Sequence, residues 1–151
     1  MIYLKTFENY RFDNILYHGS DVEHKFDTRG YITDGTFFSE DINVARDYGK
    51  YVYQVVIKDV PIFDTTDIKD ITELFDAFDE LFDRYSETYI SDPNGFIHSS
   101  DTWDPIENTD GVINWLKAEG YHGVRIIEGG SESNILLFYP SEDIMKYNLK
   151  N

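Results

Sequence analysis

Short apolar segments separated by glycine-containing turns constrain how this chain can fold. The clearest segment is Tyr51–Ile57, where β-branched and aromatic residues lie between Gly49 and Pro61 and predict a strand. Shorter apolar runs predict further strands at 15–17, 36–38, 124–127 and 135–139. None of these runs approaches the roughly 20 apolar residues of a membrane-spanning helix. The pattern therefore predicts a globular domain with many short strands and no membrane partner.

Helical periodicity is strongest over residues 70–85, where apolar side chains recur every three or four positions. The apolar stripe consists of Ile71, Leu74, Phe75, Phe78, Leu81, Phe82 and Tyr85. The positions between them are mostly Asp and Glu, so we expect the stripe to contact the core. Shorter helices are expected between Ser39, a potential N-cap, and Gly49, and over residues 111–119.

Residues 86–110 are polar and include two prolines, which is typical of a long surface loop. The segment after Pro140 is expected to form a short helical turn and a final extended piece. With 151 residues, the chain fits a single domain that can bury a core of its own. Together the elements predict one α+β domain over residues 1–151, with about five to seven short strands.

The chain is strongly acidic, with 29 Asp and Glu against 13 Lys and Arg and a net charge of −16. Such a surface repels phosphate groups, so no direct binding to nucleic acid is expected. Three explanations of the acidity stay open: solubility, attraction to a basic partner such as a nucleic-acid-binding protein, and mimicry of nucleic acid.

Composition also excludes several kinds of site. The chain has no Cys, which rules out disulfides, thiolate catalysis and cysteine-based zinc sites. His24, His98 and His122 do not have the spacing of metal ligands, so no metal is expected. The first residues lack the basic start and apolar stretch of a signal peptide, and a cytoplasmic location is therefore expected.

Four motifs follow one another in an informative order. The first is Tyr17-His18-Gly19-Ser20, and the second is Gly35-Thr36-Phe37-Phe38, with Tyr48 thirteen residues after Gly35. The third is Tyr121-His122-Gly123-Val124. The fourth consists of Glu128 and Glu132, which precede the apolar run Ile135–Pro140. In this order they resemble the ADP-ribosyltransferase superfamily, in the branch that diphtheria toxin and poly(ADP-ribose) polymerases share with small phage and bacterial proteins. The resemblance covers about two-thirds of the chain and leaves out residues 60–110.

The resemblance implies an ADP-ribosyltransferase-like fold, with two short packed β-sheets, a few helices and a long helical or loop insertion. It implies NAD as the substrate and a cofactor site that contains His18, Gly19, Ser20, Phe37 and Tyr48. His18 would bind the ribose of the adenosine half and count among the catalytic residues. Gly19 would bind the nicotinamide amide, and the rings of Phe37 and Tyr48 would flank the nicotinamide.

The catalytic carboxylate has two candidates. Cleavage of the bond between ribose and nicotinamide builds positive charge on the sugar, which a nearby carboxylate stabilises. Glu132, just ahead of the last apolar strand, is the first choice, and Glu128, found by counting forward from Val124, is the second. Counting back from Phe138 instead places Asn134 where the polymerases carry their Glu, which would make the protein a binder without catalysis.

The resemblance implies a mono-ADP-ribosyltransferase that modifies a macromolecule, expected to be a protein. The early Tyr-His-Gly-Ser, the Glu119-Gly120-Tyr121 turn and the strand ending at Pro140 also resemble phage anti-CRISPR ADP-ribosyltransferases, which act in the host cytoplasm. Three alternatives stay open. They are a non-enzymatic acidic inhibitor or nucleic-acid mimic that binds a basic protein, a bacterial ADP-ribosylating toxin, and NAD hydrolysis without a macromolecular acceptor.

Overall fold

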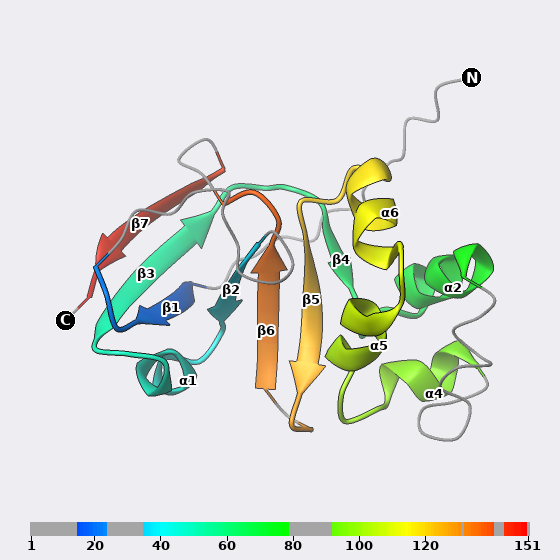
Figure 1. The fold of residues 1–151 in the computed structure, drawn as a ribbon, viewed down its shortest axis with the longest axis horizontal. Helices are drawn as coiled ribbons and strands as arrows, with labels where there is room; N and C mark the ends of the chain where they lie inside the picture. The colour runs from blue at the N-terminus through cyan, green and yellow to red at the C-terminus, as the bar shows by residue number, and fades with distance from the viewer. Residues whose placement is uncertain (1–14, 24–34, 79–91, 131, 141–143, 151) are drawn as a thin grey trace.

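The computed structural model describes residues 15–23, 35–78, 92–130, 132–140 and 144–150. The strands are β1 (Leu16–Ser20), β2 (Thr36–Ser39), β3 (Tyr51–Ile57), β4 (Ile62–Asp64), β5 (Gly123–Glu128), β6 (Glu132–Leu137) and β7 (Met145–Leu149). The helices are α1 (Ile42–Asp47), α2 (Ile68–Ala77), α4 (Pro93–Ile97), α5 (Trp103–Asn108) and α6 (Val112–Ala118). Figure 1 shows α2, α4, α5 and α6 gathered beside β4 and β5, whereas α1 lies at the other half of the sheet.

The described strands form one seven-stranded sheet, in the order β4-β5-β6-β2-β1-β3-β7. Neighbouring strands are antiparallel except β4 and β5, which run parallel. The junction between β2 and β1 is narrow, because Tyr17 and Ser39 form the one residue pair there. This junction divides the sheet into two halves, β4–β5–β6–β2 and β1–β3–β7.

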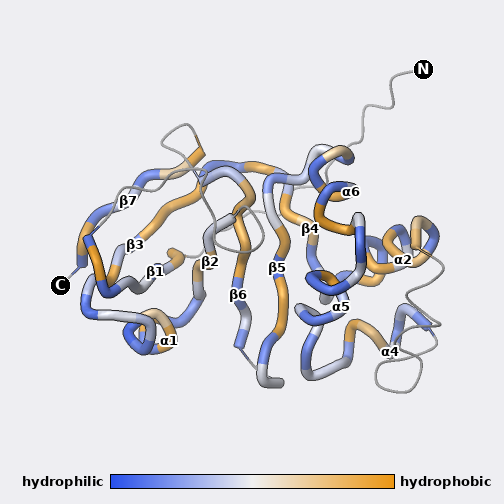
Figure 2. The backbone as a smooth tube through the Cα atoms, in the orientation of Figure 1, coloured by the Kyte–Doolittle hydropathy of each residue, from blue (hydrophilic) through white to orange (hydrophobic). Residues whose placement is uncertain are grey.

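Two hydrophobic cores lie on opposite faces of the sheet. The first collects apolar residues from both halves, so the halves pack against each other across it; it contains Leu16, Phe38, Tyr53, Val55, Ile57, Ile62, Ile135, Leu137 and Met145. The second lies between the strands β4–β6 and the helices α2, α4, α5 and α6, with members such as Phe63, Leu74, Phe96, Leu116 and Val124. Figure 2 shows the apolar stretches of β3–β6 that supply these cores.

The α+β class agrees with the structure, but the prediction of two separate sheets is wrong for the described residues. The pair Tyr17–Ser39 continues the backbone ladder across the junction and makes one sheet. Beside this pair, the His18 imidazole forms a hydrogen bond with the backbone carbonyl of Phe37. A side chain therefore occupies this backbone acceptor at the point where β1 and β2 separate. The ADP-ribosyltransferase-like fold itself stays a prediction.

The helical stripe is confirmed as far as Ala77, where the helix ends, and Phe78 of the expected stripe lies beyond it as the C-cap. Asp67 caps α2 by accepting a hydrogen bond from the Lys69 amide, and the helix buries Ile71, Leu74 and Phe75 as expected. The helix begins two residues earlier than predicted, and residues 79–85 lie outside the described part of the chain. At ten residues α2 is the longest described helix, and no described helix is long and apolar enough to cross a membrane.

The prediction of a surface loop over residues 86–110 is wrong for its described part, which contains two helices. Asp92 caps α4 through the Gly95 amide at 2.8 Å, with Pro93 in the first turn. Phe96 from α4 and Ile106 from α5 are buried in the helix-covered core. The burial of these few apolar side chains offsets the polar composition that favoured a loop.

Two smaller expectations also change. The N-cap of α1 is Asp41 and not Ser39, which is the last residue of β2 and accepts a hydrogen bond from the Asp41 amide. The short strand β4 starts directly after Pro61, a residue that we took only as the end of the preceding strand. The expected helix over residues 111–119 is confirmed as α6.

Asp70 lies in α2 and accepts a hydrogen bond from the backbone N–H of Asp64 at 2.8 Å. Burial raises the pKa of Asp70 from 3.8 to about 6, and repulsion from Asp67, Asp64 and Glu73 adds to the shift, while the hydrogen bond opposes it. Because the folded chain holds this proton more tightly than the unfolded chain, its contribution to stability is lost as the pH rises towards 6.

We predict that Asp70→Asn stabilises the protein at pH 7, because the amide cannot ionise and its oxygen still accepts the hydrogen bond. The expected gain is about 1 kcal/mol after allowance for solvent screening, and it should vanish near pH 4. Urea unfolding at both pH values measures it. Asp76→Asn, on the exposed side of the same helix, is the matched control. An equal gain in both variants would contradict the special environment of Asp70.

Candidate functional site

Gly19 marks the closest approach of α1 to the sheet. A Cβ atom at this position would overlap the backbone carbonyl of Ala45 and would lie 3.3 Å from Cβ of Tyr48. Ala45 is buried, so the helix rests directly on the backbone of β1, which only glycine permits. Tyr48 follows α1 as its C-cap, so its Cβ atom lies beside Gly19, and the side chain is 63% exposed to solvent.

The strand register brings further candidates onto this face of the sheet. Ser39 pairs with Tyr17 on one side and with Asn134 on the other, and Glu128 pairs with Glu132. Directly paired residues in antiparallel strands share a face, as do alternate residues of one strand. The residues on the α1 face are therefore Gly19, Phe37, Ser39, Glu128, Glu132 and Asn134.

The hydroxyl of Tyr48 lies in the electrostatic field of the two late glutamates. Burial of part of the ring raises the pKa of Tyr48, and the carboxylates of Glu128, Glu132 and Asp47 raise it further. Tyr48 therefore adjoins Gly19 of β1 through its Cβ atom, and its phenol feels the charges of two carboxylates from β5 and β6.

Glu128 is the half-buried carboxylate of this group. Burial raises its pKa, and the neighbouring carboxylates Asp101, Glu132 and Glu107 raise it further, while a hydrogen bond from Asn134 opposes the shift. The chain before α5 is held to β5 by Thr102, whose N–H donates to the Ile127 carbonyl at 3.0 Å.

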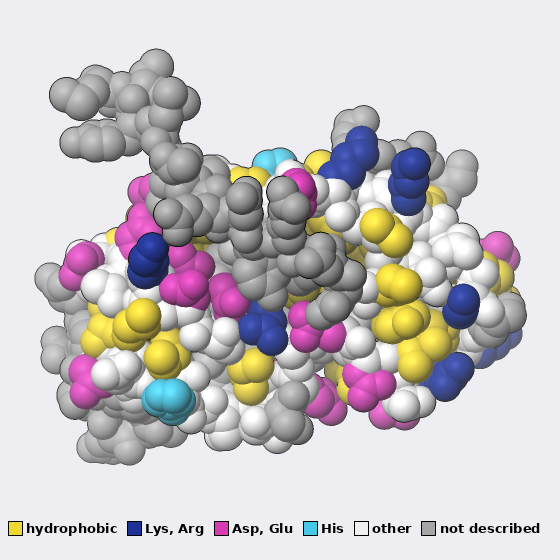
Figure 3. Space-filling view, turned by 180° about the vertical axis from the view of Figure 1, so that it is seen from behind, with side chains coloured by type: hydrophobic (Ala, Val, Ile, Leu, Met, Phe, Trp, Pro, Cys, Tyr) yellow, Lys and Arg dark blue, Asp and Glu magenta, His cyan; other side chains and the backbone are white. Residues whose placement is uncertain are grey.

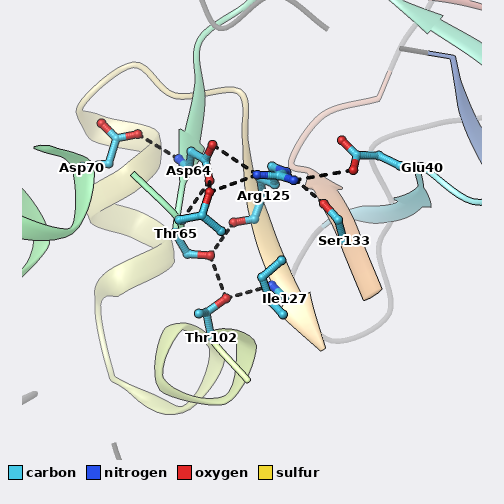
Figure 4. Close-up of polar contacts among 9 residues, drawn as sticks. Glu40, Asp64, Thr65, Asp70, Thr102, Arg125, Ile127 and Ser133 are labelled. Atoms are coloured by element: carbon cyan, nitrogen blue, oxygen red, sulfur yellow. Dashed lines mark hydrogen bonds and ion pairs between the residues drawn. The ribbon is translucent and has the colours of Figure 1, made fainter. Parts of the chain in front are cut away.

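The side chain of Thr102 forms a second connection between the start of α5 and β5. Its hydroxyl accepts a hydrogen bond from the Ile127 N–H at 2.8 Å and also bonds to the hydroxyl of Thr65 at 2.7 Å, as Figure 4 shows. Thr102 is fully buried, so this connection holds the start of α5 against β5. The acidic surroundings of Glu128 are therefore built into the packing of α5.

Asn134 lies at the centre of the face and is only 5% exposed. A carboxylate can only accept hydrogen bonds when ionised, so the amide nitrogen of Asn134 is the group that faces Glu128. Its Oδ1 atom is buried without a hydrogen-bond partner in the part of the chain that the structure describes. Asn134 thus orients the carboxylate of Glu128 through its amide nitrogen, and its Oδ1 atom remains available to accept a hydrogen bond.

Phe37 provides a second aromatic ring on this face. It is 39% exposed, and its ring meets Trp103 of α5 edge to face with 5.1 Å between the centroids. The contact with Trp103 fixes one side of the ring and leaves another side to solvent. Phe37 and Tyr48 are therefore both available to a flat ligand.

His18 and Ser20 are not brought together with the Tyr48–Glu128 group. Residues alternate along β1, so their side chains point to the face opposite that of Gly19. The His18 ring lies 5.5 Å from the ring of Phe38 and 6.5 Å from that of Tyr53, and Nδ1–H donates to the Phe37 carbonyl at 2.7 Å. Ser20 accepts a hydrogen bond from the Val22 amide.

Sequence reasoning missed the contribution of α5 to this region. Trp103, Asp101 and Glu107 all come from the segment expected to be a loop. The sequence signal was an aspartate, Asp101, just ahead of the helix, a position where Asp often caps a helix. In the structure Asp101 accepts hydrogen bonds from the amides of Trp103 at 2.8 Å and Asp104 at 3.2 Å. Within the described residues, no three His, Asp or Glu side chains are arranged to hold a metal ion.

Comparison with known proteins leaves the family open. No protein-family model matches the chain, and no curated protein matches it. One solved structure, a crystal structure of an anti-CRISPR protein, is similar with a TM-score of 0.49 and 16% sequence identity. The match covers 90% of this chain and 94% of that one. Similarity at this level assigns neither a family nor an activity.

We predict that Gly19→Ala displaces α1, because the added methyl group would overlap the Ala45 carbonyl. The expected loss of stability is about 1–3 kcal/mol, as for other overpacked sites. Thermal unfolding measures the loss, and Val22→Ala, at an exposed position beyond β1, is the control. Equal stability of Gly19→Ala and the unmodified protein would show that α1 does not rest on β1 in this way.

Proposed function

We propose that this chain is a mono-ADP-ribosyltransferase that binds the nicotinamide end of NAD beside Gly19, between the rings of Tyr48 and Phe37. One observation supports the proposal above the others. The phenol of Tyr48, whose Cβ adjoins the Gly19 position, also lies in the field of Glu128 and Glu132. Residues far apart in the sequence thus gather two exposed rings, a reachable backbone and carboxylates, the groups that this chemistry uses.

Each group has a defined task in this proposal. The nicotinamide ring of NAD is cationic, so the faces of Tyr48 and Phe37 attract it as well as stack on it. Ala45 of α1 covers the Cα side of Gly19, but Gly19 is only partly buried, and in this proposal its remaining exposed backbone pairs with the nicotinamide amide. Ala45 offers no hydroxyl for that amide, which leaves the Gly19 backbone as its partner.

Of the two glutamates, we propose Glu128 as the carboxylate that faces the ribose. It is half-buried and is oriented by the amide of Asn134, whereas Glu132 is exposed at the start of β6. A fixed carboxylate stabilises a developing positive charge without reorganisation at the moment of reaction. This choice reverses the order of preference that the sequence spacing indicated.

The reaction then follows from the charges. The bond between C1′ of the ribose and the nicotinamide nitrogen breaks, and its electron pair passes to the nitrogen and neutralises the ring. The sugar becomes positively charged, Glu128 stabilises it, and a nucleophile of the target forms the new bond to C1′. The proton of that nucleophile leaves to solvent or to a carboxylate of the site.

The proposed target is a basic protein. Glu128, Glu132, Asp101 and Glu107 lie around the site, so an approaching cationic surface is attracted to it. The resemblance to phage anti-CRISPR ADP-ribosyltransferases favours a nucleic-acid-binding protein of a bacterial defence complex as this target. Figure 3, which shows the molecule from behind, has several Lys and Arg side chains on the half that contains β3 and β7.

A second candidate function is binding without catalysis, and Asn134 favours it. The residue is buried at the position where the resemblance expects the catalytic Glu. An amide there has no charge to stabilise the sugar, so the same acidic face would act only as a docking surface for a basic protein.

We predict that the protein transfers labelled ADP-ribose from NAD to a basic protein acceptor, and that Glu128→Gln lowers kcat by about 100-fold or more, as for removal of an electrostatic stabiliser. Glu132→Gln, which removes the same charge at the exposed position, is the matched control and should lower kcat less than tenfold. Release of nicotinamide without labelled acceptor would indicate NAD hydrolysis instead. Full activity of Glu128→Gln would contradict the proposed role.

The second candidate makes a different prediction. A pure binder would hold its basic partner without NAD, would be unaffected by Tyr48→Ala, and would lose affinity steeply with added salt. Titration of binding between about 50 and 300 mM salt, with and without NAD, separates the two functions. We expect nicotinamide release to accompany binding, and its complete absence with every acceptor tested would favour the binder.

A further inference from the structure

Arg125 lies on the face of β5 opposite Glu128, and its side chain contacts four residues from other segments of the chain. Its Nε–H donates to the Ser133 hydroxyl of β6 at 2.9 Å, and Nη1 donates to the Thr66 hydroxyl at 3.0 Å. The same Nη1 is 3.5 Å from a carboxylate oxygen of Asp64, and Nη2 is 3.6 Å from one of Glu40. Figure 4 shows the guanidinium between these groups, with Glu40 approaching from the side of β2.

Glu40 occupies a position that sets the direction of α1. It lies between Ser39, the end of β2, and Asp41, the N-cap of α1. Its backbone N–H also donates to the Ser133 carbonyl at 3.4 Å, so the main chain and the side chain of Glu40 are both held at the β5–β6 side. Any displacement of Glu40 therefore displaces the first turn of the helix.

The helix is short enough to transmit such a displacement to Tyr48. It has six residues, and Tyr48 follows it directly as the C-cap. At this end α1 rests on Gly19 of β1, whereas at its start it is held through Glu40 to β5 and β6. The two attachments lie on different halves of the sheet, and together they set the distance between Tyr48 and the turn that contains Glu128.

We propose that Arg125 is a positioning residue, which through its ion pair with Glu40 holds α1 and Tyr48 in place relative to Glu128. The effect on NAD rests on the proposed function, but the effect on the position of Tyr48 does not. A guanidinium suits this task because its planar fork reaches Glu40, Asp64, Thr66 and Ser133 at once. A lysine ammonium carries the same charge but cannot make the same set of bonds.

The main test is Arg125→Lys, which keeps every charge and changes only the geometry. In the unmodified protein partial burial raises the pKa of Tyr48, and the charges of Glu128 and Glu132 raise it further. In Arg125→Lys we expect this titration to move towards the ordinary value. NMR of the protein with ¹³C-labelled tyrosine rings measures it, and Tyr48→Phe assigns the signal. The KM for NAD should rise about fivefold with kcat changed less than twofold.

Two further variants complete the experiment. Glu40→Gln removes the ion pair from the other side and should give the same two changes, so it serves if Arg125→Lys does not fold. Thr66→Val removes a bond to the same guanidinium on the side away from α1, and should leave Tyr48 and KM unchanged. Thermal unfolding confirms that each variant is folded.

The outcomes separate the two proposals. If Arg125→Lys and Glu40→Gln leave the Tyr48 titration as it is, the positioning role is wrong whatever the activity. If the titration moves in both variants while the unmodified protein shows no binding or turnover of NAD, the positioning role stands and the proposed function fails. An equal shift in Thr66→Val would show a general loosening of the network and would also overturn the assignment to Glu40.

Discussion

The narrow junction between β2 and β1 determines the arrangement of the candidate site. One residue pair, Tyr17–Ser39, joins the two halves of the sheet there. Because the chain leaves β2 at this point and enters α1, the helix crosses the junction and comes to rest on Gly19. A side chain at Gly19 would prevent that contact. The site therefore depends on the bare backbone of Gly19 and on the separation of β1 from β2 directly after the Tyr17–Ser39 pair.

The two faces of the sheet contribute differently at this junction. On the α1 face, Gly19, Tyr48, Asn134 and Glu128 form a polar and aromatic group that is open to solvent in part. On the other face, Arg125 and Glu40 form a polar network at the edge of the core that joins the two halves. The second face has no direct access to a ligand on the first, but it fixes the elements that present the site.

The concentration of carboxylates around Glu128 has a cost and a use. Burial raises the pKa of Glu128, the neighbouring carboxylates raise it further, and both effects reduce the stability of the fold when Glu128 is ionised. The packing of α5 through Thr102 holds them there nonetheless. Under the proposed function, the cationic ring of NAD and a basic target would both relieve this repulsion.

Local pattern determined most of the strands, though not β4, as well as the apolar stripe of α2 and the presence of helix α6, because alternation and helical spacing depend on neighbours in the sequence. The resemblance of four ordered motifs to the ADP-ribosyltransferase superfamily singled out Gly19, Tyr48, Glu128 and Glu132. Only the tertiary structure decided that His18 faces away from this group and that Glu128 is half-buried whereas Glu132 is exposed. Strand register, which assigns each side chain to a face, is fixed by pairing between distant segments. The same pairing placed Asn134 beside Glu128 and Arg125 beside Glu40, contacts that no short stretch of sequence encodes.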